Sequence, residues 1–80
     1  MNSWVHGFEV DVRWPQACLT VELDSRLHHD NDQAFERDRA KWNALAAAGE
    51  LVFPLTARRL RQEPAVVAAQ LTALLRERWR

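Results

Sequence analysis

The sequence has few of the features that mark secreted or membrane proteins. Its only cysteine is Cys18, so no internal disulfide can form, and a lone thiol fits a reducing compartment. The N-terminal segment has no charged region and no long apolar stretch, which argues against a signal peptide. No apolar run approaches the length that crosses a membrane. These absences predict a cytoplasmic protein without a membrane segment.

The chain also lacks net charge. Its formal net charge is +0, so no long-range field steers a polyanion toward it. The charge is unevenly placed, however, because residues 1–56 hold five basic and nine acidic side chains, whereas residues 57–80 hold six arginines and two glutamates. An acidic centre with a basic tail is compatible with a metal in the middle and phosphate at the rim. A coat of solubilising arginines on a helix explains the tail equally well.

Repeats, linkers and low-complexity segments are absent, and the length of 80 residues predicts a single domain. A chain of this size buries only about 60–65% of its unfolded surface and is marginally stable alone. The apolar share of 48% is sufficient for a packed core.

Apolar and polar residues alternate in two short runs, one before and one after residues 15–17, and this pattern predicts an antiparallel hairpin. Because side chains alternate along a strand, one face would carry six apolar residues: Phe8, Val10, Val12, Leu19, Val21 and Leu23. If Trp14 pairs with Leu19, the same register places Asp11 opposite Glu22, and Glu9 opposite Asp24, on the other face.

Like charges across a strand pair are unfavourable. At roughly 5 Å and an effective dielectric near 20, two carboxylates repel by about 3 kcal/mol. A divalent cation would offset this repulsion, because hard metal ions bind carboxylate oxygens. A solvated acidic face explains the same pattern, and on spacing alone it is the better explanation, since one-sided polar strands are ordinary in antiparallel sheets.

A helix and a third strand are predicted after the hairpin. The helix runs from about residue 32 to 48, and Gly49 is suited to end it. The apolar run 51–55 predicts a strand parallel to 19–24, because a helix connects the two as a crossover. Pro54 removes a backbone donor and so predicts either an edge position or an early end to that strand.

The C-terminal part is predicted to be helical. Thr56 could cap a short turn that ends near Leu60, and Pro64 suits the first turn of a last helix over residues 64–78. The apolar face of that helix has four members: Val67, Leu71, Leu74 and Leu75.

Several polar residues near the predicted site have two interpretations. His28 and His29 follow the second strand, and histidine suits general-base work near neutral pH, yet loop histidines are mostly ordinary surface residues. Asp38 interrupts the apolar stripe of the first helix and needs a partner if it is buried. Cys18 has no basic neighbour and is a poor nucleophile.

Four linked motifs carry a family resemblance: GFEVDVRWP, LTVELDSRLHH, AFERDRAKWNALAAAGELVFPLT and RLRQEPAVVAAQL. In this order, over about residues 5–75, they resemble the very-short-patch-repair endonuclease-like family of the PD-(D/E)XK, or restriction-endonuclease-like, superfamily. The resemblance implies an α/β fold whose core is a β-hairpin, a helix, a parallel third strand and a C-terminal helix. It also implies that nucleic acid, with DNA as the favoured substrate, is cut with Mg²⁺.

The resemblance also implies roles for individual residues. Asp11 and Glu22 match the metal-binding acids of the first and second strands. Asp24 stands at the position of the catalytic lysine in many superfamily nucleases, and His29 matches the histidine that activates water. Asp38 belongs to the Arg-Asp pair of the helix and would support the site. Three arginines would clamp phosphates: Arg26, Arg37 and Arg58.

The chain departs from the family pattern at several places. The N-terminal helix of the family is absent, Ser25 replaces a glycine, and Glu50 stands where relatives often have tryptophan. These departures predict an N-terminally truncated domain over residues 1–80. Two functions therefore remain open: a Mg²⁺-dependent endonuclease, or a catalytically inactive remnant that acts as a protein-interaction module. Exposed Trp4 and Phe8 would favour a homodimer, or a partner protein that covers the place of the missing helix.

Overall fold

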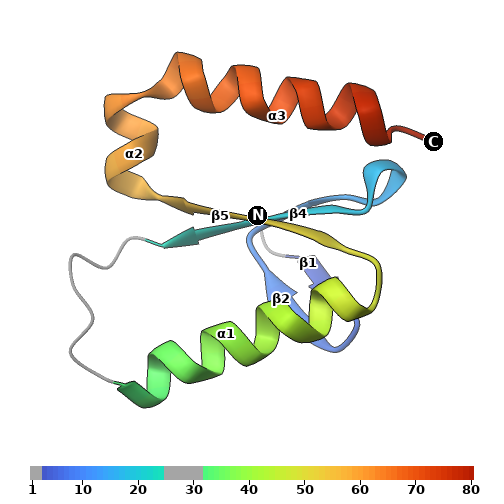
Figure 1. Ribbon diagram of the computed structural model, residues 1–80, viewed down its shortest axis with the longest axis vertical. Helices are drawn as coiled ribbons and strands as arrows, with labels where there is room; N and C mark the ends of the chain where they lie inside the picture. The colour runs from blue at the N-terminus through green and yellow to red at the C-terminus, as the bar shows by residue number, and fades with distance from the viewer. Residues whose placement is uncertain (1–2, 25–31) are drawn as a thin grey trace.

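The computed structural model describes residues 3–24 and 32–80, and it has a layered arrangement of strands and helices (Figure 1). The elements in chain order are β1 (Ser3–Val5), β2 (Phe8–Val10), β3 (Val12–Trp14), the 3-10 turn η1 (Pro15–Ala17), β4 (Leu19–Asp24), α1 (Asp32–Ala47), β5 (Leu51–Thr56), α2 (Ala57–Gln62) and α3 (Pro64–Arg78). Helix α1 lies on one side of the sheet, and α2 and α3 lie on the other. The predicted α/β class is therefore confirmed as a mixed α/β fold.

The central sheet has the strand order β3-β4-β5. Strands β3 and β4 pair antiparallel with Trp14 opposite Leu19, as predicted from the turn at residues 15–17. Strands β4 and β5 pair parallel, from Leu19↔Leu51 onward, and α1 connects them. The predicted parallel third strand is confirmed. Pro54 lies on the edge strand β5, where its missing N–H costs no ladder hydrogen bond.

A separate N-terminal hairpin corrects the predicted one. Strand β2 pairs with β1, so Glu9 lies opposite Trp4 and not opposite Asp24. The connecting residues His6 and Gly7 both have positive φ, 50° and 86°, which is the requirement of a two-residue type I′ turn. Such a turn matches the twist of its strands, so the chain reverses direction between β1 and β2 before β3 begins.

The apolar face predicted for residues 8–12 is also wrong. The chain bends at Asp11, between β2 and β3. Val10 packs with Val5 and with Leu45 of α1, whereas Val12 borders a groove on the α3 side of the sheet. A bend breaks the two-residue alternation, so the side chains before and after it face different layers.

Helix α1 ends in a Schellman motif. Gly49 has a φ of 96°, its N–H donates to Ala46 O at 3.0 Å, and the N–H of Glu50 donates to Leu45 O at 3.0 Å. These bonds satisfy the last carbonyls of the helix and turn the chain into β5. The predicted role of Gly49 is confirmed.

The two C-terminal helices begin as predicted. Thr56 Oγ1 accepts a hydrogen bond from Arg59 N at 3.0 Å and caps α2, and Pro64 opens α3.

Among the described residues, no helix is both long and apolar enough to cross a membrane.

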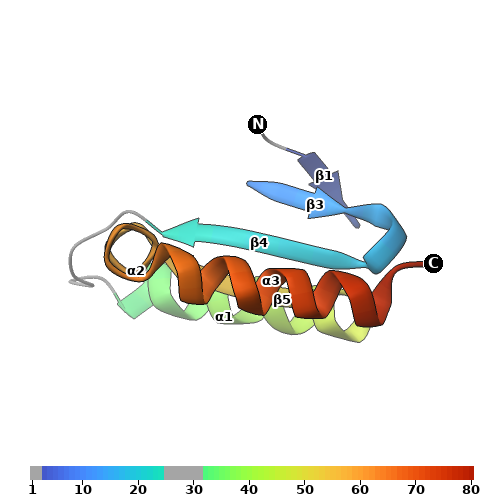
Figure 2. The same cartoon turned by 90° about the horizontal axis from the view of Figure 1, so that it is seen from above.

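Two apolar clusters lie on opposite faces of the sheet. Val5, Val10 and Leu45 form the cluster on the α1 side. The cluster on the α3 side consists of Val21, Leu55 and Val67, with Trp14, Phe53 and Leu71 packed against it. In Figure 2, β3 lies beyond the area that the helices cover, so the helices on the α3 side of the sheet cover mainly β4 and β5.

Candidate functional site

Glu22 is the centre of the candidate site. It lies near the carboxyl end of β4, and its Oε2 accepts a hydrogen bond from Lys41 Nζ of α1 at 3.1 Å. The same ammonium donates to the backbone oxygen of Glu9 at 2.6 Å. Lys41 therefore joins α1, β2 and β4 around one carboxylate. The sequence alone gave no reason to single out this lysine.

The other oxygen of Glu22 has no hydrogen-bond partner within residues 3–24 and 32–80. Oε1 is buried, and no described residue donates a hydrogen bond to it. Burial raises the pKa of the Glu22 carboxyl above its ordinary value of 4.5, the charges of Asp11 and Asp38 add to the rise, and Lys41 opposes it. A buried oxygen without a donor is costly, so this atom is the strongest local indication of a ligand.

Asp11 is held at the sheet edge. Its Oδ2 accepts a hydrogen bond from the backbone N–H of Leu23 at 2.7 Å, in place of the strand partner that the bend removes. Glu22 faces α1, whereas Asp11 also borders the groove on the α3 side. The charge of Asp11 acts on Glu22 and contributes to the raised pKa of that carboxyl.

Asp24 and Asp38 line one cleft of about 210 Å³. It opens between α1 and the ends of β4 and β5, and its walls include Phe35, Trp42 and Thr56. Ligand sites in α/β folds often lie at the carboxyl ends of strands. Asp38 relates this cleft to Glu22, because the charge of Asp38 contributes to the raised pKa of the Glu22 carboxyl.

Two of the remaining predicted residues, Arg37 and Arg58, do not line the cleft. Both are exposed, Arg37 on α1 and Arg58 on α2. His29 and Arg26 lie outside the described residues.

The carboxylates near Glu22 fit Mg²⁺, which needs few protein ligands, better than an ion that is coordinated by protein side chains alone. Within residues 3–24 and 32–80, no group of three or more His, Cys, Asp or Glu side chains is spaced to hold a metal. Mg²⁺ is usually bound by one or two carboxylates and keeps several waters, and substrate phosphates complete its shell. Asp11 and the unpartnered oxygen of Glu22 match that minimal set.

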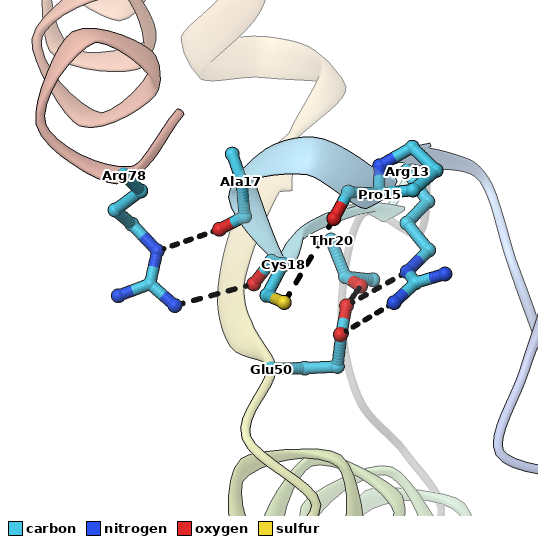
Figure 3. Close-up of polar contacts among 7 residues, drawn as sticks. All are labelled: Arg13, Pro15, Ala17, Cys18, Thr20, Glu50 and Arg78. Carbon is cyan, nitrogen blue, oxygen red and sulfur yellow. Dashed lines mark hydrogen bonds and ion pairs between the residues drawn. The ribbon is translucent and has the colours of Figure 1, made fainter. Parts of the chain in front are cut away.

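A second polar cluster, centred on Glu50, was not predicted from the sequence. The Glu50 side chain is 1% exposed, and Arg13 donates to its two oxygens at 3.0 and 2.8 Å (Figure 3). The hydroxyl of Thr20 donates a third bond at 2.8 Å. The hydrogen bonds from Arg13 hold the pKa of Glu50 below its ordinary value against the effect of burial. Glu50 is thus a structural residue, and its partner Arg13 lies on β3, two strands away in the sheet.

The end of α3 is anchored beside this cluster. Arg78 Nε donates to Ala17 O at 2.9 Å, and its Nη2 donates to Cys18 O at 3.4 Å (Figure 3). The backbone N–H of Arg80 donates to Gln16 O at 2.9 Å. These bonds satisfy carbonyls of the η1 turn and fix the last turn of α3 against the sheet.

The class defined by this geometry is a small mixed α/β fold with an acidic site at the end of its central strand. No family model matches the chain, and no solved structure matches it. Two curated proteins of Mycobacterium tuberculosis, from strain CDC 1551 / Oshkosh and strain ATCC 25618 / H37Rv, are similar to it. Each is 32% identical over 69 residues, which is 82% of this chain and 26% of the relative. Both are named as uncharacterised proteins, and the chain spans about a quarter of their length.

Proposed function

We propose that this chain is a metal-dependent hydrolase of nucleic-acid phosphodiesters, with a restriction-endonuclease-like core and DNA as the favoured substrate. The observation that carries the proposal is the buried Oε1 of Glu22, to which no residue in the described part of the chain donates a hydrogen bond, in a site where Asp11 and Asp38 add negative charge. The resemblance of the sequence motifs to very-short-patch-repair endonucleases gives the reaction its class.

Asp11 and Glu22 would hold Mg²⁺ in this proposal. The ion, when bound, would polarise the phosphate and lower the pKa of a bound water. The backbone N–H of Leu23 orients Asp11 through Oδ2. Lys41 donates a hydrogen bond to Glu22 Oε2, and in this proposal its positive charge would stabilise negative charge that develops on the phosphate. His29 keeps the proposed role of water activation, and Arg26, Arg37 and Arg58 keep that of phosphate contacts.

A protein-interaction module is the second candidate. An apolar groove of about 330 Å³ lies between the β3–β4 edge and the two C-terminal helices. Three of its lining side chains are large, apolar and exposed: Val12, Leu23 and Leu60. Exposed apolar surface of this kind often forms an interface. A catalytically inactive remnant could use it to bind a second copy or another protein.

Cleavage of plasmid DNA tests the first candidate. The purified wild-type protein is expected to nick supercoiled plasmid with Mg²⁺ or Mn²⁺ and not with EDTA. Asp11→Asn and Glu22→Gln are each expected to reduce the rate by at least about a hundredfold, because each removes a charged ligand of the ion. Gel analysis of the nicked and linear products measures the rate.

A matched variant separates the protein's activity from a contaminating nuclease. Glu36→Gln makes the same chemical change on the exposed face of α1, and it should cut like the wild type. Equal cleavage by the wild-type, Asp11→Asn and Glu22→Gln proteins would contradict the proposed function. Absence of cleavage by the wild type on both DNA and RNA, with either ion, would favour the interaction module.

A further inference from the structure

Arg39 on α1 is held between two aromatic rings. Its guanidinium carbon lies 4.2 Å from the ring centroid of Phe35 and 4.4 Å from that of Trp42. The spacings of four and three residues place all three side chains on one side of the helix. Both distances lie within the range of a cation–π interaction. The guanidinium is therefore fixed in position even though the residue is exposed.

The hydrogen-bond donors of Arg39 have no acceptor among the residues that the structure describes. The rings contact the guanidinium, but neither ring accepts a conventional hydrogen bond from its N–H groups. No described carboxylate or carbonyl accepts from them either, in contrast to Arg13, Arg59 and Arg78. A fixed planar guanidinium with free donors is preorganised for a planar or tetrahedral oxyanion, because little side-chain entropy is lost on binding.

The position of Arg39 relates it to the candidate site. Arg39, Phe35 and Trp42 line the same cleft as Asp38, and the charge of Asp38 acts on Glu22. Asp38 therefore links the cleft that holds Arg39 with the proposed metal ligand Glu22. Asp24 and Asp38 would repel a bound phosphate, and among the described residues of the cleft lining Arg39 is the cation that offsets this repulsion.

We infer that Arg39, held by Phe35 and Trp42, binds a phosphate group of the nucleic-acid strand and positions the strand over the Glu22 site. The inference rests on the proposed function, and it names a contact that the sequence motifs did not assign. Arg39 acts through a phosphate outside the reaction and is a positioning residue. Its planar donors suit two oxygens of one phosphate.

Binding and its salt dependence test this role. The probe is a short, fluorescein-labelled DNA duplex of mixed sequence, and the protein carries Glu22→Gln so that cleavage does not interfere. In Mg²⁺, addition of Arg39→Gln should weaken binding by roughly tenfold. The slope of log K against log salt concentration should fall in magnitude by about one, because one phosphate contact is lost. Fluorescence anisotropy over a series of KCl concentrations measures both quantities.

Two further variants test whether the position of the charge and the planar shape of the Arg39 side chain matter. Arg76→Gln makes the same charge change on an exposed part of α3 and should leave affinity and slope unchanged. Arg39→Lys keeps the charge and the slope, but it should bind several-fold more weakly because an ammonium lacks the planar fork. Circular dichroism melting checks that each variant is folded.

The outcomes distinguish this inference from the proposed function. If the Glu22→Gln protein binds DNA and Arg39→Gln alters neither affinity nor slope, the inference alone is overturned. If Arg39→Gln and Arg76→Gln weaken binding equally, Arg39 has no specific role and the inference is again overturned. If the expected binding changes occur but wild-type protein does not cut DNA, the inference stands and hydrolysis is excluded. If no protein binds the duplex, both fail.

Discussion

At the residue scale, Glu22 is unusual because the two oxygens of its carboxylate differ in hydrogen bonding. One oxygen is paired with Lys41 and the other has no donor among the described residues. Folding therefore stabilises the neutral form of the carboxyl, which is the meaning of its raised pKa. An arrangement that costs stability in the free protein is typical of residues kept for function.

Glu22→Gln should raise the melting temperature slightly at neutral pH in the absence of metal. The folded-state pKa lies above the unfolded value of 4.5, so the folded state binds more protons. Wild-type stability therefore falls as pH rises from 4.5 through the folded-state pKa, and Glu22→Gln lacks this fall. Thermal melts across this pH range, with Glu36→Gln as the control for a charge change on an exposed surface, measure the difference.

The same melts with Mg²⁺ complete the test at this residue. A ligand that binds only the folded state raises its stability, so the wild type should gain in melting temperature and Glu22→Gln should not. If the wild type gains nothing from Mg²⁺ and Glu22→Gln is no more stable without it, the acidic cluster is solvated surface.

At the element scale, Glu50 connects three strands. It lies at the start of β5, and it accepts hydrogen bonds from Arg13 of β3 and Thr20 of β4. Removal of one member of such a pair leaves a buried charge without compensation, whereas joint replacement by apolar residues is often tolerated. The cluster is therefore expected to hold the register of the sheet at the end that adjoins the η1 turn.

Arg13→Met should destabilise the fold by about 2–3 kcal/mol, somewhat less than for a fully buried pair, because the Arg13 side chain is 24% exposed. Urea unfolding measures the loss, and Arg76→Met is the control for removal of an exposed arginine. The double variant Arg13→Met with Glu50→Met should recover most of the stability. Equal losses in the single and double variants would show that packing, and not the unpaired charge, is responsible.

The pH dependence of this pair has the opposite sign to that of Glu22. The pKa of Glu50 is lowered in the folded state, so its contribution is present above the unfolded value of 4.5 and disappears as pH falls through the folded-state pKa. Arg13→Met should flatten this acid-side loss, and the same urea series at decreasing pH measures it.

At the scale of the whole molecule, the chain is more open than its length requires. Its radius of gyration is 13.0 Å, whereas a compact domain of this length has a value of about 12 Å. The groove between the β3–β4 edge and the C-terminal helices accounts for part of this openness, since Leu23 and Leu60 on its lining are 44% and 41% exposed. Trp4, on β1, is 72% exposed, and Phe8 is half-buried against the cluster on the α1 side.

We expect the protein to associate in solution through the groove, and a symmetric homodimer is the commonest arrangement. Sedimentation equilibrium at micromolar concentration should give a mass above that of the 9.3 kDa chain. Leu60→Glu should restore the monomer mass, because it places a charge in the apolar lining. Val66→Glu changes an exposed apolar residue that does not line the groove and should leave association unchanged. A compact monomer at all concentrations would contradict this expectation.

The local elements were largely determined by the sequence itself. Gly49 ends α1, Thr56 caps α2 and Pro64 opens α3 at the predicted positions, because each acts through its own backbone or through neighbours within a few residues. The turn at residues 15–17 likewise set the pairing of Trp14 with Leu19. The parallel arrangement of β4 and β5 followed from the length of the helix between them.

The tertiary structure alone decided how distant side chains meet. The bend at Asp11 redirected Val10 and Val12 to different layers, and it left Asp11 to bond the backbone of Leu23. Lys41 reaches Glu22, and Arg13 reaches the buried Glu50, across separations of 19 and 37 residues. Such contacts depend on the relative placement of whole elements. Periodicity identifies the face of a helix or strand, but not the side chain that packing brings opposite to it.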